Sequence, residues 1–249
     1  MPKLFACSDI HSGFTPWMKA LNEAGFDENN PDHTIIVCGD LLDRLGESLQ
    51  VYEFAKDMMD KGKMIYVMGN HEILMAQCLK RKFPLGYDWH NGTATSIIDL
   101  APEAETFEEA CDVVYEKMKL LWDKAVNYVE SREYIFVHSW IPTFTQNGGH
   151  HMYNKGWRNA SQEEWNKSTW VNPFEMADKG LNQTGKTVVF GHFHTSYARS
   201  KYHGEPEFGD GSNFDIYYGN GYIGIDSCVS YSKKLNCLVI KDELIDGKG

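Results

Sequence analysis

The chain has 249 residues, of which 42% are apolar and 24% are charged, as in a folded globular protein. This length fits one large domain and is enough to bury a sizeable core. The formal net charge of −11 leaves no excess of Lys and Arg for binding a nucleic-acid duplex. No apolar run approaches the roughly 20 residues that span a bilayer, and the first residues do not resemble a signal peptide. These features predict a cytoplasmic protein that binds neither membranes nor duplex nucleic acid.

The six cysteines support the same interpretation. They form no CxxC pair, and several of them lie in apolar segments that are typical of strands. We therefore expect reduced, buried thiols rather than a disulfide framework. The cysteines are at positions 7, 38, 78, 111, 228 and 237.

Short apolar runs rich in Val, Ile, Phe and Tyr recur along the chain and predict strands. In chain order these runs are 3–7, 34–38, 63–68, 133–137, 186–190, 222–225 and 235–240. Apolar residues at helical spacing lie between them, over 17–24 and 47–60 and most regularly over 107–129. This alternation predicts a single α/β domain over residues 1–249.

Three further segments have a distinctive composition. A helical insertion is expected over about 73–132, where the longest amphipathic pattern lies. The segments 143–156 and 203–221 are rich in Gly, Asn and Tyr, and we expect both to be long loops.

Polar residues follow five of the predicted strands directly. The carboxyl edge of an open α/β sheet is where ligands bind, so these side chains are expected to meet in one cleft. Asp9 and His11 are two positions apart and would point to one side of an extended chain. The glycines at 39, 69 and 191 would let the backbone turn sharply where a strand ends. The polar side chains at these strand ends are Asp9, His11, Asp40, Asn70, His138, His192 and His194.

The composition of this set predicts a metal centre. Carboxylate and amide oxygens together with imidazole nitrogens suit Mn, Fe or Zn better than Ca or Mg alone. Seven ligands are too many for one ion, but they suit two ions about 3.5–4 Å apart that share a carboxylate. We expect Mn²⁺, with Fe and Zn as alternatives.

These motifs resemble those of the calcineurin-like metallophosphoesterase superfamily, and within it the phosphoprotein-phosphatase family with its phage and bacterial members. The resemblance extends over roughly residues 3–240. The segments that carry it are Gly39-Asp40-Leu41-Leu42-Asp43-Arg44 (similar to GDxxDRG), Gly69-Asn70-His71-Glu72 (GNHE), Trp89-His90-Asn91-Gly92 (W..NGG), Val137-His138-Ser139-Trp140-Ile141-Pro142 (VHAGIP) and Ile225-Asp226-Ser227-Cys228 (IDTG).

The resemblance implies a four-layer fold with two mixed β-sheets flanked by helices. It also implies roles for the site residues: Asp9, His11 and His194 hold the first ion, Asn70, His138 and His192 hold the second, and Asp40 bridges both. Arg44 would clamp the phosphoryl oxygens with help from Asn70, and His71, oriented by Asp43, would protonate the leaving group. A hydroxide that bridges the metals would attack phosphorus in line. Glu72 would have a supporting role.

The sequence also departs from the family pattern. Leu45 separates Arg44 from Gly46, and the first metal motif, Asp9 to Gly13, is one residue longer than SDxHG. Asn172 stands where a second phosphate-binding arginine is usual, and Arg158 is a candidate substitute beside Trp157.

Three functions remain open at this point. The leading one is a dinuclear phosphomonoesterase acting on phosphoserine or phosphothreonine. The alternative is a dinucleoside polyphosphate hydrolase, in which aromatic residues would stack on adenine. The third is an inactive scaffold, which the complete set of candidate ligands disfavours. The aromatic candidates are Trp157, Trp165, Trp170, Tyr197, Tyr202, Tyr217 and Tyr218.

Overall fold

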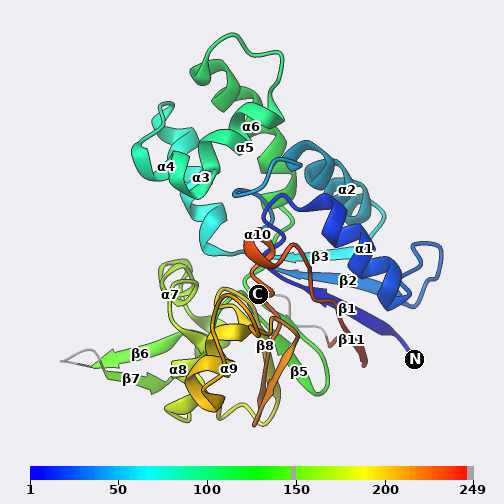
Figure 1. The fold of residues 1–249 in the computed structure, drawn as a ribbon, viewed down its shortest axis with the longest axis vertical. Helices are drawn as coiled ribbons and strands as arrows, with labels where there is room; N and C mark the ends of the chain where they lie inside the picture. Colours follow the sequence, from blue (N-terminus) through cyan, green and yellow to red (C-terminus); the bar gives the residue numbers. More distant parts are fainter. Residues whose placement is uncertain (147–149, 246–249) are drawn as a thin grey trace.

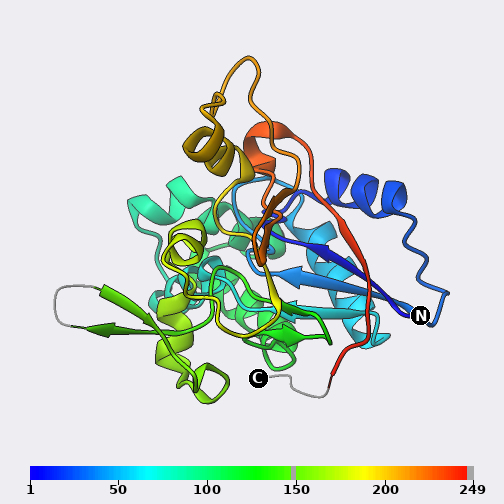
Figure 2. The same cartoon turned by 90° about the horizontal axis from the view of Figure 1, so that it is seen from below.

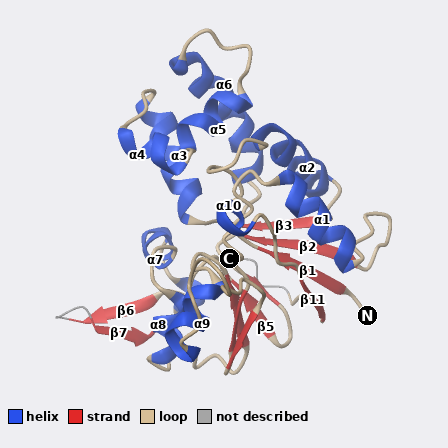
Figure 3. Cartoon of the chain, in the orientation of Figure 1, coloured by secondary structure: helices blue, strands red, loops and turns tan. Residues whose placement is uncertain are grey.

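Two β-sheets lie face to face at the centre of the molecule, and helices cover their outer faces (Figures 1 and 3). The structure is a computed structural model that describes residues 1–146 and 150–245. The first sheet has the order β11-β1-β2-β3, with β1, β2 and β3 parallel and β11 antiparallel to β1. Its strands are β1 Lys3–Cys7, β2 His33–Cys38, β3 Met64–Val67 and β11 Leu238–Lys241.

The second sheet has the order β4-β5-β8-β10-β9 and is also mixed. Strands β5, β8 and β10 are parallel, whereas β4 and β9 are antiparallel to their neighbours. Its strands are β4 Val129–Glu130, β5 Tyr134–Phe136, β8 Thr187–Phe190, β9 Tyr217–Gly219 and β10 Tyr222–Gly224. A separate hairpin, formed by β6 Thr143–Gln146 and β7 His150–Tyr153, projects from the body of the molecule (Figure 2).

The helices divide between the two sheets. Those before β4 pack on the side of the first sheet, and most of those that follow β7 cover the second (Figure 1). The first group is α1 Phe14–Ala24, α2 Ser48–Asp60, α3 Asn70–Arg81, α4 Gly86–Asn91, α5 Thr93–Leu100 and α6 Phe107–Trp122. The later helices are the 3₁₀ turn η1 Trp157–Asn159, α7 Gln162–Ser168, α8 Pro173–Asp178, α9 Thr195–His203 and α10 Val229–Ser232.

The alternation of side chains along each strand explains the layers. In β1, Phe5 and Cys7 face the core under the first group of helices, whereas Leu4 and Ala6 face the other sheet. Phe136 of β5 meets them from the second sheet. Because every central strand is apolar on both faces, the sheets bury each other and each also buries a helical layer. The predicted four-layer α/β fold is confirmed.

The predicted element boundaries need three corrections. The helix expected over 107–129 ends at Trp122, since Val126 forms a parallel bridge with Val67 and Val129 belongs to β4. The segment 143–156 is mostly not a loop: its described residues as far as Tyr153 form the β6–β7 hairpin, and a turn follows. The segment 203–221 is mostly loop but includes β9, which pairs with β10.

The cysteines are all free thiols, as expected, although two of them are only partly buried. Four are buried, and Cys228 and Cys237 are the partly exposed ones. Within the described ranges we also find no helix with the length and apolar character that crossing a bilayer requires.

Candidate metal and phosphoester site

The carboxyl ends of β1, β2, β3, β5 and β8 converge on one edge where the two sheets meet. Among the described residues, two groups of side chains have ligand atoms within 4.8 Å of one another. One group is His11, Asp40 and His71, and the other is Asp40, His138 and His192. Asp40 belongs to both groups, so its carboxylate lies between two positions where an ion could bind.

Asp9 and Asn70 lie within the same cluster. Asp9 Oδ1 is 3.9 Å from His11 Nε2, and Asp9 Oδ2 accepts a 2.9 Å hydrogen bond from the backbone N–H of His192. Asn70 Oδ1 is 2.7 Å from His138 Nε2. Six of the seven predicted metal ligands therefore come together at the seam between the sheets.

His194 has other contacts in this structure. Its Nδ1 caps α9 by accepting a 3.2 Å hydrogen bond from the N–H of Tyr197, and its Nε2 lies 3.4 Å from Glu207 Oε1. Its ring also packs against Phe208. To bind an ion with Asp9 and His11, the ring would have to give up these contacts, so this role stays a prediction.

The backbone at the site adopts the left-handed conformation at several candidate ligands. The φ angles are 51° at Asp9, 47° at His11, 54° at Asp40 and 66° at His192. Residues other than glycine rarely adopt this conformation, and clusters of them are typical of functional sites. Asp9 and His11 therefore lie in a tight turn after β1, and not in the extended chain that the sequence suggested.

The glycines beside the ligands are required mainly for space. A Cβ atom on Gly69 would lie 2.3 Å from Asp40 Oδ1, and one on Gly191 would lie 2.1 Å from Asp9 Oδ2. A Cβ on Gly39 would lie 2.4 Å from His138 Nδ1, and only this one of the three has a positive φ, 79°. Sharp turning, the role predicted from sequence, thus applies to Gly39 alone.

The imidazole rings are oriented by backbone carbonyls. His11 Nδ1 is 3.1 Å from the carbonyl of Leu42, and His138 Nδ1 is 2.9 Å from that of Cys38. Only an N–H can bond to a carbonyl, so in each neutral ring Nε2 carries the lone pair and points into the cluster. This arrangement is typical of histidines that bind metals through Nε2.

The donor set fits divalent cations. The oxygen atoms of Asn70 and Asp40 lie 2.7 and 3.4 Å from His138 Nε2. When this ring is neutral, the lone pair of Nε2 therefore faces the lone pairs of two oxygen atoms with no hydrogen atom between them. A cation, or a proton on the ring, relieves this conflict. Burial lowers the pKa of His11, and it lowers the pKa of His192 to about 3 with a further contribution from His138. Both rings are therefore neutral, as metal ligands must be.

The two buried carboxylates respond differently to their surroundings. Burial raises the pKa of Asp9 to about 6, and the nearby Asp40 carboxylate adds to this effect. Burial also opposes ionisation of Asp40, but His138 and His71 outweigh it and hold the pKa of that carboxyl well below its usual range. The shared carboxylate is thus the charged centre of the cluster.

Arg44, His71 and Asp43 form a second constellation at the edge of this cluster. His71 Nδ1 lies 2.8 Å from Asp43 Oδ2, which also accepts a 2.6 Å hydrogen bond from Thr93. Arg44 Nε donates to His11 Nε2 at 3.1 Å, and its terminal NH₂ group is 3.2 Å from His71 Nε2. Burial opposes protonation of His71, but Asp40 and Asp43 outweigh it and raise its pKa to about 9.

Glu72 has a more definite place than the sequence suggested. Its carboxylate is buried and accepts hydrogen bonds from the backbone N–H groups of Gly69, Asp40 and Leu41 at 2.7–3.1 Å. It therefore ties the loop after β2 to the loop after β3 and fixes the backbone of Asp40. The sequence signal for this role was the acidic residue in the first turn of α3, which also caps that helix.

Asp226 is a buried acid that sequence reasoning placed in a motif without giving it a role. Burial raises its pKa well above the usual range, and the nearby Asp9 carboxylate adds to the shift. Its Oδ1 accepts a 2.7 Å hydrogen bond from the N–H of Cys228. The IDTG-like segment was the only signal that could have pointed to it.

Arg158 hydrogen-bonds elsewhere. Its guanidinium makes two hydrogen bonds, at 2.9 and 2.7 Å, to the buried carboxylate of Glu130 and stacks on Trp157. Asn172 caps α8 by accepting from the N–H groups of Phe174 and Glu175. Phosphate binding by Arg158 stays a prediction, and it would require this ion pair to open.

Most of the predicted base-stacking aromatics pack in the core under the second sheet. Trp157, Trp165 and Tyr217 are buried there, and Tyr197 and Tyr202 pack against the same cluster. Trp170 and Tyr218 are exposed. Of these two, Trp170 has its backbone against the His192 imidazole.

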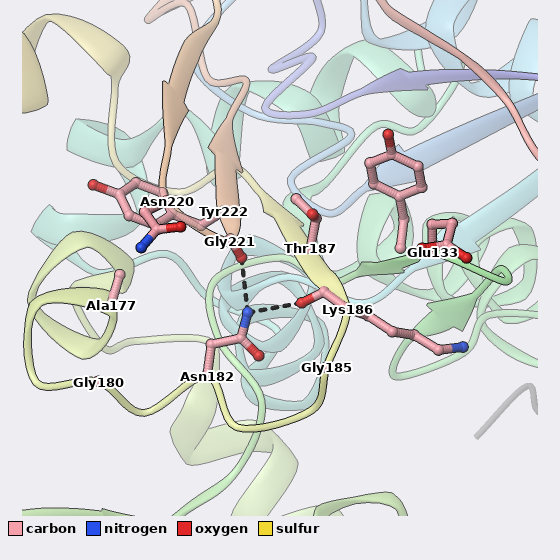
Figure 4. A pocket seen from close by; sticks show the side chains of 11 residues that line it. Glu133, Ala177, Gly180, Asn182, Gly185, Lys186, Thr187, Asn220, Gly221 and Tyr222 are labelled. Carbon is pink, nitrogen blue, oxygen red and sulfur yellow. Dashed lines mark hydrogen bonds between the residues drawn. The ribbon is translucent and has the colours of Figure 1, made fainter.

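A separate recess of about 560 Å³ lies at the opposite end of the second sheet (Figure 4). It is lined by residues at the amino-terminal ends of β8 and β10, including Thr187 and Tyr222. The amide of Asn182 donates to the carbonyls of Lys186 and Gly221 at 2.8 and 2.7 Å, so its hydrogen atoms already have partners. None of the predicted site residues lines this recess.

The chain belongs to the calcineurin-like phosphoesterase family, whose family model matches residues 2–219. A match over 105 residues, 28% identical, links it to bis(5'-nucleosyl)-tetraphosphatase PrpE [asymmetrical] of Bacillus velezensis. That match spans 40% of this chain and 42% of the relative, so it extends over less than half of either protein.

Solved structures support the fold assignment. The crystal structure of a candidate diadenosine tetraphosphatase has a TM-score of 0.55 at 16% identity, with 98% of this chain and 95% of that chain covered. A point mutant of a cold-active protein tyrosine phosphatase has a TM-score of 0.50 at 15% identity, with 97% of this chain and 76% of that chain covered. At these identities the likeness extends to the fold alone.

Proposed function

We propose that this chain hydrolyses phosphomonoesters, with phosphoserine and phosphothreonine as the leading substrate class. The observation that carries the proposal is the hydrogen bond between His71 and Asp43, beside the guanidinium of Arg44 and the shared carboxylate of Asp40. A serine or threonine alkoxide is a poor leaving group, and its departure is assisted when a positioned acid supplies a proton.

His71 is the proposed proton donor. Its Nδ1–H is held by Asp43, so the opposite nitrogen, Nε2, is directed toward the cluster, 3.9 Å from Asp40 Oδ2. In the protonated ring Nε2 carries the proton that would pass to the leaving oxygen. Asp43 holds the ring in this orientation and favours its charged form.

Arg44 is the proposed phosphoryl clamp. Its guanidinium spans His11 and His71, which belong to the group that also contains Asp40. A planar fork of N–H donors suits the oxygens of a phosphoryl group better than a point charge does. We assign Asn70 a supporting contact with the phosphoryl group, made by its side-chain amide.

The proposed ligands include both groups of side chains except His71, which is assigned as the proton donor. Asp9, Asp40 and His11, once its Nε2 is released by Arg44, would hold one ion, with His194 as a further ligand after it leaves Glu207. Asp40, Asn70, His138 and His192 would hold the other. When bound, the two cations would activate a water molecule and neutralise charge on the phosphoryl group. The mixture of oxygen and nitrogen donors favours Mn²⁺, with Fe and Zn as alternatives.

Hydrolysis of a dinucleoside polyphosphate is the second candidate. It is favoured by the PrpE relative, whose name states a bis(5'-nucleosyl)-tetraphosphatase activity. Among the predicted stacking residues, the candidate is the exposed Trp170, whose backbone lies against the His192 imidazole. Under this alternative, replacing Trp170 with Ala would raise KM for the dinucleotide more than for a phosphopeptide.

Parallel assays test the proposal. Mn²⁺-loaded protein is incubated with a phosphoserine peptide and with diadenosine tetraphosphate, with Asp40→Asn as the blank. We expect phosphate release from the peptide. Turnover of the dinucleotide alone would transfer the assignment to the second candidate. Equal results for wild type and Asp40→Asn, in both metal content and hydrolysis, would indicate an inactive scaffold.

A further inference from the structure

Two cysteines face each other across the β1–β11 strand pair. The antiparallel register pairs Phe5 with Val239 and ends with Ala6 opposite Leu238, and one further step of the same register would bring Cys7 opposite Cys237, the residue just before β11. Directly opposed residues in an antiparallel pair have Cα atoms about 4.5–5.5 Å apart. This separation lies within the roughly 4.4–6.8 Å range of disulfide-bonded cysteines.

Both side chains also lie on the same face of the sheet. Cys7 belongs to the core between the first sheet and its helices, and Cys237 packs against that core. The nearby Cys237 thiol raises the pKa of the Cys7 thiol, together with burial. Cys38, on the adjacent strand β2, faces the opposite core between the sheets, so it is not placed to bridge to Cys7.

The two thiols differ in their access to solvent. Cys7 is fully buried, whereas Cys237 is partly exposed and lines an open recess of about 440 Å³ beside α1 and β11. A small oxidant can therefore approach Cys237 from solvent, whereas Cys7 is shielded from solvent. An accessible thiol with a second thiol within reach is the arrangement of an oxidisable dithiol.

We propose that Cys7 and Cys237 form a peroxide-oxidisable dithiol that closes to an intramolecular disulfide. The Cys237 sulfur attacks hydrogen peroxide, the O–O bond breaks, and sulfenic acid and one water form. The Cys7 sulfur then attacks the Cys237 sulfur, the S–O bond breaks, and a second water leaves as the S–S bond forms. Two thiols are oxidised by two electrons in total, and the peroxide is reduced to water.

Thiol counting and peptide mapping test this proposal on the full chain. After hydrogen peroxide treatment, the count of thiols in the denatured protein should fall from six to four, and dithiothreitol should restore it. Trypsin should then release residues 4–19 linked to residues 235–241, since Lys3, Lys19, Lys234 and Lys241 bound these peptides. Six remaining thiols, a loss that dithiothreitol does not reverse, or a linkage to another cysteine would overturn the proposal.

Matched variants identify the pair. Cys237→Ser should keep all five remaining thiols after peroxide treatment, whereas Cys7→Ala should lose the Cys237 thiol to sulfenic acid without forming a linked peptide. Cys228→Ser removes the other partly exposed cysteine and should still yield the 4–19 and 235–241 linked peptide. If Cys228→Ser abolished that linked peptide, Cys228 would be the thiol that reacts first with peroxide. The assignment of that step to Cys237 would then be wrong. The mapping of the wild-type chain decides the question even where a variant folds poorly.

Discussion

The two sheets contribute to the site in different ways. The loops after β1, β2 and β3 supply both carboxylates, two imidazoles and Arg44, and they are fixed by Glu72 and Asp43. The strands β5 and β8 supply the imidazoles of His138 and His192, and these are held by groups from the first sheet. The backbone carbonyl of Cys38 accepts a hydrogen bond from His138 Nδ1, and the Asp9 carboxylate accepts one from the backbone N–H of His192.

In the proposed assignment, the first sheet supplies the charged carboxylates and the second would complete the coordination of one ion. A carboxylate shared by both groups, Asp40, stands at the seam between them. Each ion would therefore depend on the same first-sheet residue, whereas the second-sheet histidines would belong to one ion only.

The largest effect is expected for Asp40→Asn. We expect hydrolysis to fall by more than the roughly 10²–10⁴-fold that a positioned proton donor contributes, because both groups lose their shared ligand. Metal content should fall as well. Phosphate release and bound Mn²⁺ are the measurements, and Asp57→Asn, an exposed acid on α2, is the control. If the two variants behaved alike, the seam would not be the catalytic centre.

Replacing His71 with Asn separates the proton donor from the ligands. We expect kcat to fall by roughly 10²–10⁴-fold on a phosphoserine peptide, where the leaving group needs a proton. The loss should be much smaller on p-nitrophenyl phosphate, and Asp43→Asn should give the same pattern. Equal losses on both substrates would contradict the acid role.

Mn²⁺ should stabilise the contact between the sheets. A ligand that binds only the folded state, at about 100 times its Kd, raises the free energy of unfolding by about 2.7 kcal/mol. We therefore expect a higher melting temperature with Mn²⁺, which chelation reverses. Asp40→Asn should respond much less. A shift of the same size in both proteins would place the bound ions elsewhere.

Gly191→Ala tests the space around Asp9. The added Cβ would lie 2.1 Å from Asp9 Oδ2, so Asp9 or the chain must move. Overpacking of this kind costs about 1–3 kcal/mol of stability, and we also expect weaker Mn²⁺ binding. Gly86→Ala is the control, since a Cβ there meets nothing within 4 Å. Thermal unfolding and metal titration are the measurements, and matching results for the two variants would refute the spatial role.

Glu72→Gln tests how strongly the backbone of Asp40 is held. The amide keeps one acceptor oxygen but turns an NH₂ group toward backbone N–H groups. Loss of such a supporting partner typically lowers metal affinity or activity by about 10–100-fold. Glu53→Gln, at an exposed position of α2, should leave both unchanged. An unaffected Glu72→Gln would mean that other contacts suffice to fix Asp40.

Local pattern was enough to predict the fold class and most strands. Their runs are apolar on both faces, and the Asp, Asn or His residues that follow them are adjacent in sequence to the strand ends. Boundaries were predicted less well. The helix over 107–129 has an apolar pattern that continues past Trp122, and only the bridge between Val67 and Val126 explains where the chain leaves the helix.

The contacts of long side chains depended on the rest of the molecule. Arg158 and His194 have the chemistry of a phosphate binder and a metal ligand, but their present partners, Glu130 and Glu207, are 28 and 13 residues away in sequence. The aromatic residues Trp157 and Trp165 were candidates for base stacking, yet they form part of the core under the second sheet. No local pattern distinguishes these uses of the same side chain.

The sequence by itself determined the α/β layers and the family, because strand periodicity and the spacing of the polar motifs are local properties. The tertiary structure decided that Asp40 lies between the two groups, that Gly69 and Gly191 leave room for carboxylates, and that Cys7 faces Cys237. Each of these facts depends on two segments that are distant in the chain and meet only when the sheets assemble.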